Sequence, residues 1–221
     1  MVGGRKMKQT KISITVILLF GLGLFFFGTD GFQAFTTETA RTHKLIEQQP
    51  TFPNVELEDS KKRTYSFDEF KGKYVFITFI YTACTDVCPQ LELNMYEVYE
   101  QIPETYKGED IVFLSISFDP KNDTPEVLER YREFFHSDGE TWRMARINDK
   151  KALQQLLDSF GVIVIPDENG HFQHNSAFYM VDREGTLINV LDFTEIDEAA
   201  ETVNDLLQTN RSTIKKGGKT S

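Results

Sequence analysis

Residues 74–89 read YVFITFIYTACTDVCP, and this stretch decides the fold. Residues 74–81 are almost all apolar and favour β structure, as expected of a central strand buried on both faces. Pro89 suits the first turn of a helix, because it lacks a backbone N–H that would have no partner there. The stretch therefore predicts a buried strand, a short loop and a helix, with Cys84 and Cys88 between strand and helix.

Strands and helices alternate along the chain after this stretch. A second buried strand is expected at 111–118, and Thr124-Pro125 and Asp149 are each suited to begin a helix. The other expected elements are a hairpin and turn at 51–70, strands at 142–147, 177–181 and 186–193, and a last helix after Thr194. This alternation predicts an α/β protein with a parallel core sheet, to which the closing hairpin adds antiparallel strands. The plan is that of a thioredoxin-like fold with inserted elements.

The N-terminus has the pattern of a membrane anchor. Residues 1–11 contain four basic residues and no acidic one, and residues 12–28 contain no charge. A membrane-spanning helix needs about 17–25 apolar residues, and a cationic flank stays in the cytoplasm. We therefore expect one transmembrane helix at 12–28, with the globular domain on the extracytoplasmic side of the cell membrane. A cleaved signal peptide is the alternative, although Thr29-Asp30-Gly31 is a poor cleavage site.

Composition limits the partners of the chain. Hydrophobic residues make up 40% of the 221 residues, and the net charge is −10. A nucleic-acid-binding protein normally presents a basic face, so no nucleic-acid partner is expected. The expected divisions are a cytoplasmic basic segment 1–11, the anchor 12–28, a tether 29–50, the thioredoxin-like domain 51–208 and a basic flexible tail 209–221.

Cys84 and Cys88 are the two cysteines of the chain, and they lie four positions apart. This spacing places two side chains on one face of a helix, and a helix N-terminus favours the thiolate form. Two sulfurs so placed can share one metal ion, or they can close a redox-active disulfide if the loop bends. The pair is therefore expected to be a site, and its spacing alone leaves both chemistries open.

A metal shared by two thiolates needs a further donor, and imidazole is a suitable one. The chain has four histidines. His43 is expected to be a solvated surface residue, and His136 is expected near a helix C-terminus, where a cation is favoured without any further role. His171 and His174 flank the entry to the strand expected at 177–181, which can lie near the cysteine loop. Spacing favours His174 and keeps His171 open. Soft thiolate donors select Cu(I) over most other metals.

Three features resemble the Sco/SenC family. Residues 82–89, TACTDVCP, are similar to its T-x-C-x-D-V-C-P signature, and 115–124, SISFDPKNDT, resemble its S-I-D-P-x-x-D-T segment with Phe118 as a departure. His174 stands where the family places its copper-binding histidine. Gln173 and Asn175, on either side of it, also depart from the usual pattern.

The resemblance implies a thioredoxin fold with an N-terminal membrane anchor. It implies one copper ion per chain, Cu(I) or Cu(II), held by Cys84, Cys88 and His174. It further implies a metallochaperone that delivers copper to, or reduces, the binuclear copper site of cytochrome c oxidase subunit II. Asp86, which the family motif shares, is expected to orient the loop or the metal partner, or to cap the helix.

Three other classes compete with this interpretation. A membrane-anchored thiol–disulfide oxidoreductase is the main alternative, although its usual motif is C-x-x-C. A peroxiredoxin would need Pro and Thr where this chain has Ile77 and Tyr81. A structural zinc site could use His171 as a fourth ligand, but its two ligand pairs would be far apart in the sequence.

Overall fold

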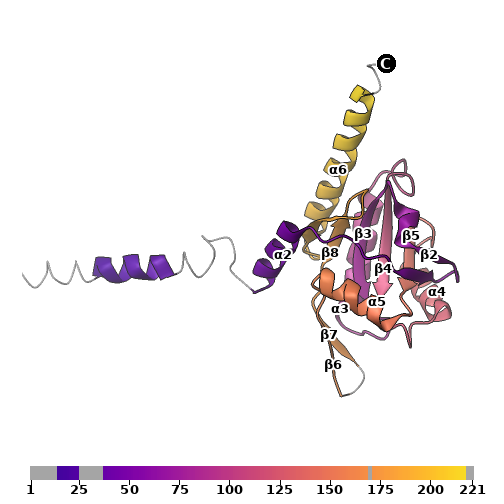
Figure 1. Cartoon of the computed structure of the whole chain (residues 1–221), viewed down its shortest axis with the longest axis horizontal. Helices are drawn as coiled ribbons and strands as arrows, with labels where there is room; N and C mark the ends of the chain where they lie inside the picture. Colours follow the sequence, from indigo (N-terminus) through magenta and orange to yellow (C-terminus); the bar gives the residue numbers. More distant parts are fainter. Residues whose placement is uncertain (1–13, 25–36, 169–170, 218–221) are drawn as a thin grey trace, which may run out of the picture. The chain divides into compact units, whose positions relative to one another are not determined.

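The computed structural model describes residues 14–24, 37–168 and 171–217 (Figure 1). The chain divides into two units, Met1–Lys44 and Leu45–Ser221. In the first unit a helix spans residues 14–24, within the predicted anchor at 12–28. The rest of that anchor lies outside the described residues, and none of the described helices is both long and apolar enough to span a membrane. Helix α2 (Thr37–Gln48) begins in the first unit and ends in the second.

The second unit is built on a seven-stranded mixed sheet with the order β2-β1-β5-β4-β3-β8-β9. The strands are β1 (Glu56–Asp59), β2 (Thr64–Ser66), β3 (Tyr74–Ile80), β4 (Ile111–Ser117), β5 (Trp142–Arg146), β8 (Phe178–Val181) and β9 (Leu187–Leu191). Strands β3, β4 and β5 are parallel, and β8 pairs antiparallel with β3. This arrangement confirms the predicted α/β fold, with its parallel core and antiparallel closing hairpin.

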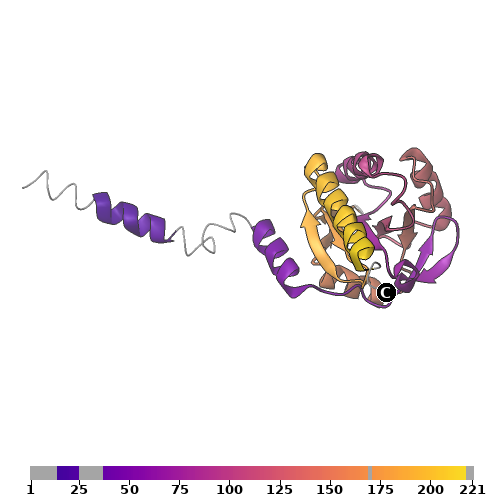
Figure 2. The same cartoon turned by 90° about the horizontal axis from the view of Figure 1, so that it is seen from above.

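Helices cover both faces of this sheet. They are α3 (Val87–Gln101), α4 (Pro125–Phe134), α5 (Lys150–Ser159) and α6 (Ile196–Gly217), with a short 3-10 helix η1 at Phe67–Phe70. Figure 2 shows α3 and α6 side by side on one face, in agreement with their close contact. On the other face Phe160, which follows α5, packs against Phe79 of β3. A strand covered on both sides has to be apolar throughout, which explains the near-continuous hydrophobic run of β3.

Two local signals in the sequence act as predicted, and one element was not foreseen. The Asp149 side chain accepts hydrogen bonds from two backbone N–H groups of α5, and Pro125 occupies the first turn of α4. The unforeseen element is a separate two-stranded hairpin of β6 (Val164–Pro166) and β7 (Phe172–His174). Its strands are short and one contains a proline, so they leave little periodic signal. Helix α2 lies within the segment 29–50 that was expected to be a tether, and α6 continues into the expected tail at 209–221.

Candidate metal centre

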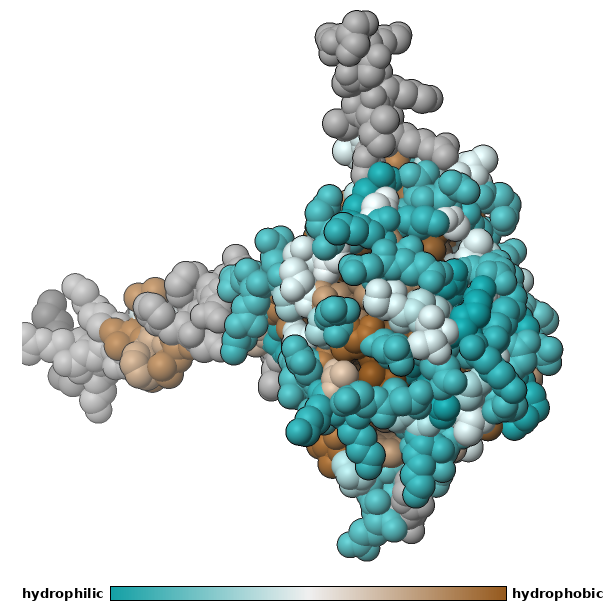
Figure 3. All heavy atoms as spheres, turned by 45° about the vertical axis from the view of Figure 1, so that its right-hand side comes forward, coloured by the Kyte–Doolittle hydropathy of each residue, from teal (hydrophilic) through white to brown (hydrophobic). Residues whose placement is uncertain are grey.

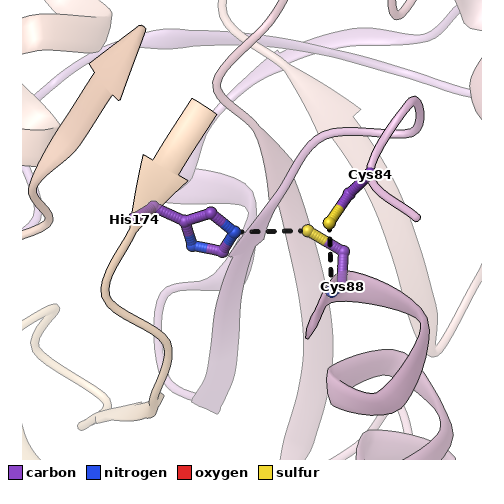
Figure 4. Close-up of side chains that lie close together, drawn as sticks. All are labelled: Cys84, Cys88 and His174. Carbon is purple, nitrogen blue, oxygen red and sulfur yellow. Dashed lines mark hydrogen bonds between the residues drawn. The ribbon is translucent and has the colours of Figure 1, made fainter. Parts of the chain in front are cut away.

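Cys84, Cys88 and His174 come together at one end of the central strands (Figure 4). One ligand atom from each residue lies within 4.8 Å of the other two. The Cys88 Sγ is 3.4 Å from Nε2 of His174, and the Cys88 backbone N–H donates to the Cys84 Sγ at 3.4 Å. The structure therefore gathers the three predicted ligand residues into one cluster, although His174 is distant from the cysteines in the sequence.

The loop between β3 and α3 positions both cysteines. Cys84 lies in this loop, and its N–H donates to the carbonyl of Tyr81 at 3.2 Å. Cys88 is the second residue of α3 and is completely buried, whereas Cys84 is 7% exposed. The loop after β3 thus places Cys84 at the site, and the first turn of α3 places the sulfur of Cys88 beside that of Cys84.

His174 ends strand β7 and presents a neutral nitrogen to the cysteines. Its Nδ1 lies 3.1 Å from the backbone carbonyl of Asn175. A carbonyl can only accept, so Nδ1 carries the proton and Nε2 keeps a free lone pair facing Cys88. Burial also lowers the pKa of His174, although the bond to Asn175 opposes this shift. The neutral imidazole is the form that binds metals.

Asn175, one of the departures from the family pattern, has a structural role of its own. Its side-chain oxygen accepts a hydrogen bond from the N–H of Ile163 at 2.6 Å, and its amide donates to the carbonyl of Gly161. These bonds connect the residue after β7 to the segment before β6. The orientation of His174 relies on the backbone carbonyl of Asn175, so the ligand position is compatible with this side chain.

One electrostatic prediction is wrong for the metal-free protein. The helix N-terminus was expected to favour a thiolate, but burial raises the pKa of the Cys88 thiol strongly. Removal of a charged sulfur from water is the main cause of the raised pKa of Cys88, and the hydrogen bond with the Tyr81 backbone offsets it only in part. Burial therefore favours the thiol form of Cys88 in the metal-free protein, and a metal ion bound here would have to displace its proton.

Asp123, in the segment between β4 and α4, anchors the cysteine loop. Its carboxylate accepts the N–H of Thr82 at 3.0 Å, the hydroxyl of Thr82 at 2.5 Å and the hydroxyl of Ser117 at 2.5 Å. Asp123 is almost fully buried, so these bonds replace water that the carboxylate has lost. The second family-like segment thus holds the start of the loop that carries Cys84.

An aromatic cluster surrounds His174. The Phe118 ring lies 5.0 Å from the His174 ring, and the Tyr81 ring is 6.2 Å away. Phe172, two residues before His174 in β7, packs against both Tyr81 and Phe118. Phe118, which the sequence shows only as a departure from the family segment, is therefore a neighbour of the predicted ligand.

His171 and Asp86 are not brought into this cluster. His171 is exposed, and its N–H donates to the Asp167 carboxylate within the hairpin. His171 therefore does not complete a four-ligand site of two cysteines and two histidines. Asp86 is exposed and precedes α3 as its N-cap residue, but its side chain makes no capping hydrogen bond.

Glu92 is a buried acid near the site that the sequence analysis overlooked. It follows Cys88 by one helical turn, is 0% exposed, and neither carboxyl oxygen has a hydrogen bond of normal geometry among the described residues. Burial raises the pKa of Glu92 to about 8, and the nearby Ser115 hydroxyl only partly offsets this effect. The helical spacing of 88, 92 and 95 could have placed Glu92 on the buried face.

Comparisons with known proteins agree on one family. The family model described as SCO1/SenC matches residues 43–208. A SCO2-like protein of Rickettsia typhi is 30% identical over 139 residues, which cover 60% of this chain and 66% of that protein. The chain therefore spans about two thirds of the length of this relative.

Two solved structures show the same fold. The copper-bound ScoI of Arabidopsis thaliana has a TM-score of 0.63 and 19% identity, over 72% of this chain and 99% of that one. BsSco, a member of the Sco family of cytochrome c oxidase assembly proteins in which a disulfide switch was identified, has a TM-score of 0.60 and 23% identity, over 71% and 93% of the two chains.

Proposed function

The chain belongs to the SCO1/SenC family, and on that premise we propose that it is a copper metallochaperone for cytochrome c oxidase. It binds one copper ion through Cys84, Cys88 and His174. It serves assembly of the binuclear copper site of oxidase subunit II.

The observation that carries this proposal is the convergence of two sulfurs and one imidazole nitrogen within 4.8 Å of one another. Thiolates are soft ligands that select Cu(I), and imidazole suits either oxidation state of copper. A structural zinc site is closed by four ligands, whereas this cluster supplies three. The donor set therefore fits copper better than zinc.

Three ligands also suit an ion that has to leave again. Copper is cargo here, and a three-ligand site leaves room for a thiolate of the acceptor to join the metal. The acceptor cysteines release protons as they bind copper, and Cys84 and Cys88 take up protons as they release it. Burial favours the protonated form of Cys88, so release of copper is aided once this exchange begins.

The relatives support the metal and the pathway. Copper is bound in the Arabidopsis thaliana ScoI structure, and BsSco is a member of a family of cytochrome c oxidase assembly proteins. We extend both properties to this chain as part of the proposal.

A thiol–disulfide oxidoreductase is the second candidate. Both cysteines are free in the structure, and their sulfurs are close enough for a modest movement of the loop to join them. As free thiols the pair could reduce a disulfide between the cysteines of subunit II before copper arrives, and Cys84 and Cys88 would themselves be oxidised to a disulfide in that exchange. Disulfide exchange requires only the two cysteines and does not explain why His174 lies beside them. We therefore prefer copper delivery.

The proposal includes a location. The uncharged stretch at 12–28 and its basic flank favour an N-terminal membrane anchor with the copper site on the extracytoplasmic side. The copper-receiving domain of an oxidase would then face the same compartment.

A deletion strain tests the proposal. We expect loss of cytochrome c oxidase activity that added copper restores at least in part. Complementation with the His174→Ala variant should fail at low copper, whereas His171→Ala should restore activity. Normal oxidase activity together with widespread misoxidised exported proteins would instead support the oxidoreductase.

A further inference from the structure

A pocket of about 470 Å³ adjoins the candidate metal centre. It lies between α5, the loop after β4 and the β6–β7 hairpin, and we call it the Phe118 pocket. Its apolar lining includes Phe118, Leu153, Leu157, Val164 and Phe172. The volume falls within the range typical of ligand and side-chain binding pockets, roughly 300–1,000 Å³.

The pocket and the metal centre share a wall. The rings of Phe118 and Phe172 line the pocket, and Phe118 also lies 5.0 Å from the His174 ring. Phe172 and His174 are two positions apart in β7, so their side chains point to the same face of the hairpin. A group seated in the pocket would therefore be one aromatic ring away from the proposed copper ligand.

The rim of the pocket is cationic although the whole chain is acidic. Lys121 and Lys150 line it, both are exposed, and neither forms an ion pair with another described residue. Asp119 also lines the pocket, but it is mostly buried and its carboxylate accepts a hydrogen bond from the Asn122 amide. With a net charge of −10 for the chain, two unpaired lysines over an apolar floor favour an acidic occupant.

The β6–β7 hairpin also carries exposed apolar side chains, which alternate along the chain with the pocket-lining Val164 and Pro166. Ile163 and Ile165, just before and within β6, are 52% and 55% exposed. Figure 3 shows hydrophobic side chains at the surface just above the hairpin, which forms the lower tip of the domain in that view. An apolar pocket with a polar rim, on a hairpin that also exposes apolar side chains, is typical of protein-binding surfaces.

We propose that the Phe118 pocket anchors the copper-receiving domain of oxidase subunit II, taking up one of its large apolar side chains while nearby carboxylates of that domain pair with Lys121 and Lys150. This inference rests on the proposed function and adds the surface through which the partner is recognised. Anchoring there places the acceptor beside His174, and a few such buried anchors supply most of the binding energy of an interface.

Matched variants of exposed residues test the pocket without disturbing the core. The Lys121→Glu/Lys150→Glu double variant reverses the rim charge, and Gln154→Trp fills the pocket that Gln154 lines. Lys151→Glu and Gln155→Trp are the controls, because these neighbours on α5 are exposed and do not line the pocket. The full-length chain, purified in detergent and loaded with Cu(I), is mixed with increasing amounts of the soluble copper-binding domain of subunit II.

The readouts are copper bound per chain and the acceptor concentration that half-saturates the rate of transfer. We expect all four variants to bind copper like the wild type. The double variant and Gln154→Trp should raise the half-saturating concentration about tenfold or more, as for the loss of one or two contributing contacts at an interface. The two controls should match the wild type.

Other results would overturn the inference in distinguishable ways. Unchanged transfer by the double variant and by Gln154→Trp, with copper fully loaded, would reject the pocket and leave the proposed function intact. Failure of the wild type itself to transfer copper would reject the proposed function and the pocket's partner together. If the substitutions instead separate a dimer of this chain in sedimentation experiments, the occupant is a second copy and the proposal is wrong.

Discussion

At the scale of single residues, the properties of the site follow from the loss of water around its buried side chains. Cys88 and Glu92 lie one turn apart on α3 and are both fully buried, so each favours its uncharged form. His174 is oriented by one carbonyl and keeps a lone pair for a metal. Burial therefore favours the protonated Cys88 in the empty site, and copper binding there has to drive the loss of that proton.

The two hairpin histidines should differ sharply in their effect on copper. His174→Ala removes a ligand, and we expect copper affinity to fall by at least about 100-fold, more than is usual for a supporting residue. His171→Ala should leave affinity unchanged, because His171 is exposed and outside the cluster. Competition titrations with a Cu(I) chelator measure both. A larger loss of copper affinity in His171→Ala than in His174→Ala would show that His174 is not the histidine ligand.

Glu92 should make stability depend on pH. Its pKa is about 8 in the folded protein and 4.5 when unperturbed, so the folded state binds more protons between these values. The free energy of unfolding should then decrease as pH rises from about 4.5 to 8, by up to ~1.4 kcal/mol per pH unit.

Urea unfolding at several pH values tests this sign. Glu92→Gln should remove that part of the slope, so that its advantage over the wild type grows with pH. Glu97→Gln is the control, because Glu97 is exposed on the same helix. Equal slopes for the wild type and Glu92→Gln would show that Glu92 does not titrate as proposed.

At the scale of elements, the strand–loop–helix unit of β3 and α3 builds half of the site, and the β6–β7 hairpin supplies the rest. The loop is held at Thr82 by Asp123, which reaches across from the segment after β4. The hairpin holds His174 at its last strand residue. The geometry of the cluster therefore depends on two elements that are far apart in the sequence, the β3–α3 loop and the β6–β7 hairpin.

Removing the Asp123 brace should loosen the cysteine loop. Asp123→Ala leaves Thr82 and Ser117 without their acceptor, and each buried group left unpaired costs about 1–3 kcal/mol. We expect a lower free energy of unfolding and weaker copper binding. Asp119→Ala is the control, since Asp119 does not contact Thr82, and it should leave copper affinity unchanged. Wild-type copper affinity in folded Asp123→Ala would contradict the role of the brace.

The sequence could predict one of these elements far better than the other. The β3–α3 unit has a long apolar run, two close cysteines and a helix-starting proline, all local in the chain. The hairpin has two short strands, and His174 meets Cys88 across 86 positions, so only the tertiary fold brings them together. Spacing could favour His174 over His171, but it could not decide between them. The Phe118 pocket is also formed by distant segments, so no local pattern in the sequence indicates it.

At the scale of the whole molecule, the proposed copper delivery requires that the domain be held near its target. The domain has its own hydrophobic core, and the chain carries a net charge of −10. The charge is unfavourable for anionic surfaces, so the membrane attachment that we propose would depend on the N-terminal segment rather than on the domain.

The native protein should keep its N-terminal segment. The uncharged stretch 12–28 lies beside a basic flank and before a poor cleavage site, so we expect the full chain in the membrane fraction after washing with high salt. Mass spectrometry of the purified protein checks this. An N-terminus between residues 30 and 35 would show that the segment is removed as a signal peptide.

The central claim is that Cys84, Cys88 and His174 hold one copper ion, and metal analysis of the Cu(I)-loaded full-length chain tests it most directly. We predict one copper per chain for the wild type, and no tightly bound copper in Cys84→Ser or in Cys88→Ser. Retention of one copper per chain in either cysteine variant would contradict the three-ligand site.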